Sequence, residues 1–112
     1  MILNHINLTV TDVDGAAAFL EKYFGMQRQG GDSKFTVLFD DQGMVLTLMK
    51  GGQHIKYPGM FHIGFGQESK EKVNELNQRM KDGGFDVEPP EQHHAWTFYV
   101  KAPGGFLVEV LH

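Results

Sequence analysis

The chain has 112 residues, 41% of them hydrophobic, a net charge of −4 and no cysteine. This length suits one compact domain, and the lack of cysteine excludes disulfide bonds, thiolate metal ligands and a thiol nucleophile. The acidic balance argues against a nucleic-acid partner, and no apolar run is long enough to cross a membrane. Because the N-terminal residues do not resemble a secretion signal either, we expect a cytoplasmic protein.

The first predicted strand covers residues 2–10, where apolar and polar residues alternate. Alternation places successive side chains on opposite faces of a strand. One face then carries Ile2, Ile6, Leu8 and Val10, and the other carries His5, Asn7 and Thr9. The first face is expected in the core, so His5, Asn7 and Thr9 share the face turned away from it.

A helix follows this strand. Thr11 and Asp14 have the spacing of a capping box, and Gly25 provides a stop signal. Apolar residues repeat at helical intervals between them, namely Ala16, Phe19, Leu20 and Tyr23. Extended segments are then predicted at residues 35–39 and 44–49, separated by a turn at 40–43.

The second half of the chain repeats this order after a connector at residues 51–59 that is rich in glycine. A strand at 60–66 places His62 opposite a core face of Phe61, Ile63 and Phe65. A helix begins at Ser69, buries Val73, Leu76 and Met80, and ends at Gly83 and Gly84. Strands at 96–100 and 106–111 match those at 35–39 and 44–49.

The matched order predicts an internal duplication within a single domain, residues 1–112, with unit one at 1–50 and unit two at 60–112. The fold class is α+β, made of two tandem βαβββ units. A helix would cover one face of each sheet and leave the other face to line a concavity, where a ligand is expected. The alternative is that two unrelated α+β segments obey the same patterning rules.

Three residues in this pattern suggest a metal site: His5 and His62 in the first strand of each unit, and Glu109 inside an otherwise apolar strand. A buried carboxylate must be paired, protonated or coordinated, because burying it alone is very costly. Two histidines and one carboxylate form the ligand set of catalytic zinc and of non-haem iron(II). Alternatively, Glu109 pairs with Lys101 or Arg28, and each histidine is an ordinary hydrogen-bonded strand residue.

The chain resembles the vicinal oxygen chelate superfamily, which includes glyoxalase I, fosfomycin-resistance enzymes, extradiol dioxygenases and bleomycin-binding proteins. The resemblance lies in residues 3–12, 19–26, 62–65 and 102–110. It implies metal-ligand positions at His5, Thr47, His62 and Glu109. Thr47 stands where glyoxalase I has a second carboxylate, so glyoxalase I activity is not expected. The other three match manganese-dependent fosfomycin-resistance enzymes and iron(II) dioxygenases, which implies a divalent metal cofactor (Mn, Fe, Zn or Ni).

The leading functional hypothesis is a metal-dependent lyase, transferase or dioxygenase for a small oxygen-rich or aromatic substrate. The metal would act as a Lewis acid or as an oxygen-activating centre. Thr9 and Tyr99 are the expected catalytic residues, and Asn7, Thr47 and Thr97 are expected to line the substrate pocket. The alternative is a metal-independent sequestration protein of the bleomycin-resistance kind, whose cavity would favour apolar and aromatic linings.

Two further expectations concern a loop and the assembly. His93 and His94 lie in the loop at 88–95. The two alternatives for them are a role as acid or base and ordinary exposure to solvent. Two units enclose only part of the surface of larger relatives, so we expect a C2 homodimer. By resemblance to domain-swapped members, His5 of one chain would then join His62 and Glu109 of the other.

Overall fold

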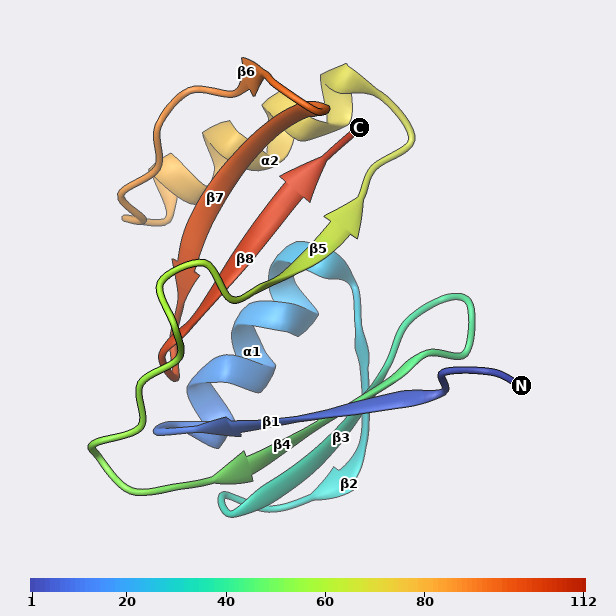
Figure 1. The fold of residues 1–112 in the computed structure, drawn as a ribbon, viewed down its shortest axis with the longest axis vertical. Helices are drawn as coiled ribbons and strands as arrows, with labels where there is room; N and C mark the ends of the chain where they lie inside the picture. Colours follow the sequence, from blue (N-terminus) through green and yellow to red (C-terminus); the bar gives the residue numbers. More distant parts are fainter. The chain divides into compact units, whose positions relative to one another are not determined.

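The computed structural model describes residues 1–112 and confirms two βαβββ units (Figure 1). The first contains β1 (His5–Val10), α1 (Val13–Phe24), β2 (Gln27–Gly31), β3 (Phe35–Phe39) and β4 (Val45–Lys50). The second contains β5 (His62–Gly66), α2 (Lys70–Asp82), β6 (Glu91–Gln92), β7 (Trp96–Ala102) and β8 (Phe106–Leu111). The chain divides into compact units Met1–Tyr57 with Pro103–Gly105, and Pro58–Ala102 with Phe106–His112.

Each unit has a four-stranded mixed sheet with the same topology. The strand orders are β1-β4-β3-β2 and β5-β8-β7-β6, and the first strand pairs in parallel with the last one in both units. In this register Asn7 is opposite Thr47, and Gly64 is opposite Glu109. The two strand histidines lie two residues before Asn7 and Gly64. The register therefore confirms the predicted correspondence of Thr47 with Glu109.

Helix α1 begins one residue later than the capping-box prediction. The N-cap is Asp12, whose carboxylate accepts a hydrogen bond from the Gly15 N–H at 2.9 Å. The Thr11 N–H instead donates to the carbonyl of Gly104, which keeps Thr11 outside the helix. Gly25 ends α1 as predicted, in the left-handed conformation with φ of 65° that glycine adopts without strain.

The core of each unit lies between its helix and one face of its sheet. The fully buried residues with the largest side chains include Leu8, Leu20, Leu38 and Leu48 in the first unit and Met80, Val73, Val108 and Val110 in the second. Burying each large aliphatic side chain contributes about 1.5–3 kcal/mol. The helix-covered face of each sheet is therefore the apolar one, as the alternation predicted, and the polar strand residues lie on the opposite face.

Several local predictions were wrong. Strand β1 begins at His5 rather than at residue 2, so Ile2 is 85% exposed instead of buried. Phe61 likewise precedes β5 and is 36% exposed. Strands β2 and β6 were missed because both are short and entirely exposed, without an apolar face to mark them. No helix combines the length and the apolar character needed to span a bilayer.

Candidate functional site

Glu109 is the centre of the candidate site in the second unit. It lies in the middle of β8 and is 4% exposed, between Val108 and Val110 in the sequence. Because Val108 and Val110 are fully buried in the core, strand alternation turns Glu109 to the opposite face. Its cross-strand neighbours on that face are Gly64 of β5 and Tyr99 of β7.

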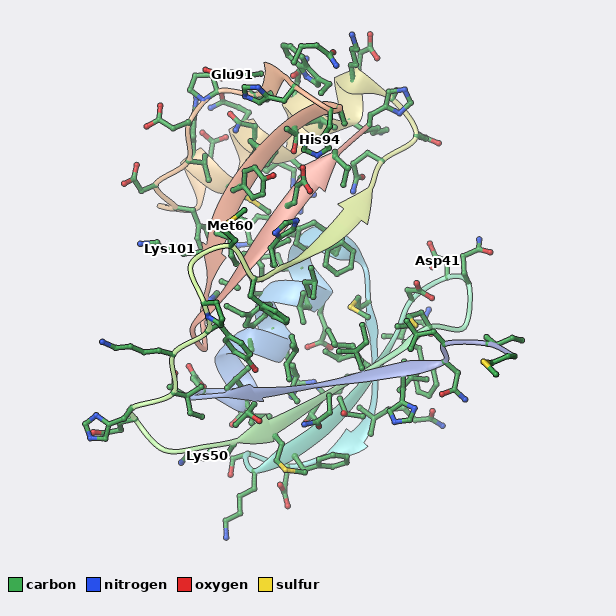
Figure 2. All side chains as sticks on the ribbon, in the orientation of Figure 1. Asp41, Lys50, Met60, Glu91, His94 and Lys101 are labelled. Carbon is green, nitrogen blue, oxygen red and sulfur yellow. The ribbon has the colours of Figure 1, made fainter.

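The two carboxylate oxygens of Glu109 have different surroundings. Oε2 accepts a hydrogen bond from the Thr97 hydroxyl at 2.7 Å and lies 2.7 Å from His94 Nε2. Oε1 faces His62 Nε2 at 3.3 Å. His94 comes from the segment between β6 and β7 and is labelled in Figure 2. Oε2 thus has two partners at 2.7 Å, Oε1 has His62 at 3.3 Å, and the Tyr99 hydroxyl also hydrogen bonds the carboxylate.

These contacts keep Glu109 ionised. Burial raises the pKa of Glu109, but hydrogen bonds from Thr97, His94 and Tyr99 lower it by more, so the pKa lies below the ordinary value of 4.5. Burial, together with the hydrogen bond to Glu109 and the charge of Glu109, raises the pKa of Tyr99 above 10.0. At neutral pH a negative carboxylate therefore faces a protonated phenol.

The alternative ion pairs considered for Glu109 do not form. Arg28 instead lies 2.7 Å from Glu21 and 3.7 Å from Asp14. The ionisable nitrogen groups that contact Glu109 both belong to histidines, His62 and His94. Unlike lysine or arginine, a histidine can present a nitrogen lone pair in place of a proton.

Two contacts fix the orientation of the His62 ring, one at each nitrogen. Its Nδ1 lies 2.8 Å from the Met60 carbonyl oxygen, which can only accept, so Nδ1 carries the ring proton. His62 Nε2 points at Glu109 Oε1 at 3.3 Å. With a protonated ring this contact is an ion pair, and with a neutral ring Nε2 and Oε1 present lone pairs that can share a cation. Histidines that bind metal ions usually donate the N–H of their other ring nitrogen to a carbonyl or carboxylate oxygen in this way.

The predicted residues of the first unit lie together on β1 and β4. The Thr47 hydroxyl donates to Asn7 Oδ1 at 2.6 Å. His5 Nδ1 lies 2.7 Å from Asn4 Oδ1. The backbone N–H and carbonyl of Thr9 both bond the Tyr57 hydroxyl, at 2.9 and 2.8 Å.

The structure thus brings together part of the predicted site in each unit. His62, Thr97, Tyr99 and Glu109 lie together in the second unit, and Asn7 and Thr47 in the first. Within either unit, no three His, Asp or Glu side chains are arranged to hold a metal ion. Sequence reasoning left open the role of His94 and did not consider Gly64. The His93 side chain, in contrast, lies outside this cluster and forms an exposed pair with Glu91 at 3.1 Å.

Comparison with known proteins identifies the family. The Glyoxalase/Bleomycin resistance protein/Dioxygenase superfamily matches residues 2–110. A possible glyoxalase from Bacillus cereus is 54% identical, with a TM-score of 0.95 over 100% of this chain and 99% of that one. The fosfomycin resistance protein FosX from Listeria monocytogenes, in complex with Mn(II) and sulfate, is 26% identical, with a TM-score of 0.80 over 99% and 90%. An uncharacterized protein of Pseudomonas aeruginosa is 29% identical over 96% of this chain and 85% of its own length. With a match across nearly its whole length, the chain belongs to the Glyoxalase/Bleomycin resistance protein/Dioxygenase superfamily.

Proposed function

We propose that this protein is a divalent-metal-dependent enzyme that acts on a small oxygen-rich or aromatic substrate. The observation that carries the proposal is the contact between His62 Nε2 and Glu109 Oε1 at 3.3 Å, which places an imidazole nitrogen beside a carboxylate oxygen. An ionised carboxylate and a neutral imidazole are suitable ligands for Mn, Fe, Zn or Ni. The Mn(II) bound by the Listeria relative makes manganese the first ion to test.

His62 and Glu109 are two of the proposed ligands, and His5 is the third. The resemblance to swapped relatives assigns His5 to the other chain of a C2 homodimer, so each site would combine residues of two chains. When bound, the metal would supply Lewis acidity to neighbouring oxygens of the substrate or activate oxygen. The sequence therefore supplies three ligands, and the remaining coordination positions are left to substrate and water.

The other polar residues have separate tasks in this proposal. Thr97 donates a hydrogen bond to Glu109 Oε2 and so acts as a positioning residue through the carboxylate. Tyr99, which remains protonated, and Thr9 orient the substrate by hydrogen bonds. Asn7 and Thr47 contribute polar surface in the first unit.

A sequestration protein of the bleomycin-resistance kind is the second candidate. It is favoured by two adjacent apolar side chains, Phe35 on β3 and Met49 on β4, which face each other across the sheet and remain 38% and 46% exposed. An apolar patch of this kind suits an aromatic ligand. Under this alternative the purified protein holds no metal and binds aromatic drugs.

Metal content distinguishes the two candidates. We expect purified protein reconstituted with Mn(II) to hold one ion per chain and Glu109→Ala to lose it while keeping its circular dichroism spectrum. Glu91→Ala is the matched control, because Glu91 also pairs with a histidine at 3.1 Å but is exposed and lies outside the site. Full metal occupancy in Glu109→Ala would show that the ligand assignment is wrong.

A mixing experiment tests whether the site is shared between chains. His5→Ala and Glu109→Ala proteins are combined under conditions in which subunits exchange. In a mixed dimer one site contains both substitutions and the other contains only intact ligands, so metal binding should reappear. If mixed dimers form but bind no metal, the ligands do not come from two chains and the swapped arrangement is wrong.

A further inference from the structure

Gly64 in the second unit occupies the position that Asn7 occupies in the first, but the residue opposite has free space beside it in the second unit alone. In the first unit Asn7 is opposite Thr47, and Asn7 Oδ1 accepts a hydrogen bond from the Thr47 hydroxyl at 2.6 Å. In the second unit Gly64 is opposite Glu109 and has no side chain. The position that is closed by Asn7 in the first unit is therefore open beside the carboxylate in the second.

The fold itself does not require glycine at position 64. Gly64 is not among the residues with positive φ, so its backbone suits any residue. An added Cβ would lie 3.4 Å from Leu111 Cδ2 and 3.9 Å from Glu109 Oε1, which are ordinary contact distances. Glycine inside a strand also weakens it, because glycine loses more conformational entropy on folding and packs nothing. Neither backbone conformation nor crowding explains this residue.

The carboxylate atom nearest to the missing side chain of Gly64 is Oε1 of Glu109. Oε2 of Glu109 is occupied by Thr97 and His94, both at 2.7 Å. Of the two carboxylate oxygens, Oε1 is the one within 4 Å of an added Cβ, and it faces His62 Nε2. A side chain at position 64 would thus occupy the space beside Oε1.

We infer that Gly64 is a specificity-determining residue that keeps Oε1 of Glu109 open to a divalent cation and its bound substrate oxygens. This inference rests on the proposed function, since it concerns access to the same ligand atom. Asn7 is the closed counterpart in the first unit, where it bonds Thr47 in place of a carboxylate. The ligand class that fits this position is a hard or borderline cation, because the atoms that face each other beside Gly64 are a carboxylate oxygen and an imidazole nitrogen.

The test measures Mn(II) affinity of the full chain by isothermal titration calorimetry, with thermal unfolding of the metal-free proteins measured alongside. In Gly64→Asn the new amide N–H can donate to Oε1, and we expect Mn(II) to bind about ten- to hundredfold more weakly. Gly66→Asn is the matched control, because Gly66 lies two residues further along the same face of β5, with no neighbour within 4 Å of an added Cβ. Its Mn(II) affinity should equal that of the unchanged protein.

Gly64→Val separates occupation of space from the new hydrogen bond, and valine is also favoured in strands, so this variant keeps the test valid if Gly64→Asn does not fold. It should weaken Mn(II) binding while the metal-free protein unfolds at the same or a higher temperature. Unchanged affinity in the folded Gly64 variants, or an equal loss in Gly66→Asn, would overturn the inference while leaving the proposed function intact. If the unchanged protein binds no divalent ion, the proposed function is wrong and this inference falls with it.

Discussion

Replacing Thr97 by valine tests the hydrogen bond that orients Glu109. Thr97 is 3% exposed, and its hydroxyl lies 2.7 Å from Glu109 Oε2 and 3.1 Å from the Val110 carbonyl. Valine has nearly the same shape, so the substitution removes a donor without opening a cavity. Because a hydrogen bond to a charged group contributes about 1.5–3 kcal/mol, we expect Thr97→Val to lower the free energy of unfolding by that amount at neutral pH.

The sign of the pH dependence follows from the lowered pKa of Glu109. A carboxyl group whose pKa is lower in the folded state stabilises the fold at pH values above its unfolded pKa, near 4.5. This stabilisation is lost as the pH falls through the folded pKa. The hydrogen bond from Thr97 is part of what lowers that pKa, so the cost of Thr97→Val should shrink as the solution is acidified below that value.

Urea denaturation followed by circular dichroism, at neutral pH and below pH 4.5, measures this difference. The control is Thr36→Val, because Thr36 is fully buried and donates to a neutral acceptor, the Asp32 carbonyl, at 3.2 Å. Its cost should be about 0.5–1.5 kcal/mol at either pH. An equal, pH-independent cost at both threonines would refute the argument that Thr97 stabilises an ionised Glu109.

Three other predictions concern single contacts. His94→Ala should raise the pKa of Glu109, and His94→Gln, which keeps a hydrogen-bond donor, should lower that pKa again in part. Side-chain NMR titration measures both values, and an unchanged pKa in His94→Ala would contradict the contact. Asp12→Ala removes the N-cap of α1 and should lower the free energy of unfolding by about 1 kcal/mol in urea denaturation, whereas no change would argue against the cap. Hemithioacetal isomerisation assayed with nickel, zinc and manganese should be absent or trace, because Thr47 bonds Asn7 where glyoxalase I has a carboxylate, and robust turnover would refute this prediction.

Strand alternation and helical spacing were sufficient to predict much of the fold. Local patterns predicted the inward face of β1 and the buried side of α1. They also predicted that Thr47 holds the position in the first unit that Glu109 holds in the second. They could be predicted because apolar residues at period 2 or 3.6 must face the core for the unit to be stable. Patterns failed where no such face exists, as in the fully exposed β2 and in the two residues of β6.

The candidate site was predicted less completely. Glu109 could be singled out from the sequence because a carboxylate in an apolar strand needs a partner. The identity of that partner depends on which loops and strands meet it. His94 is fifteen residues away in the sequence and reaches Oε2 through the conformation of the segment before β7.

The sequence by itself determined the duplicated βαβββ order and the correspondence of its strand positions, because both depend on local periodicity. Only the tertiary structure decided that Thr97 and His94 occupy Oε2 of Glu109, while Oε1 faces His62 beside Gly64. The two oxygens of a carboxylate are chemically identical in a sequence. They become different only when the strand register and the loops place particular donors within hydrogen-bonding distance of one oxygen and not of the other.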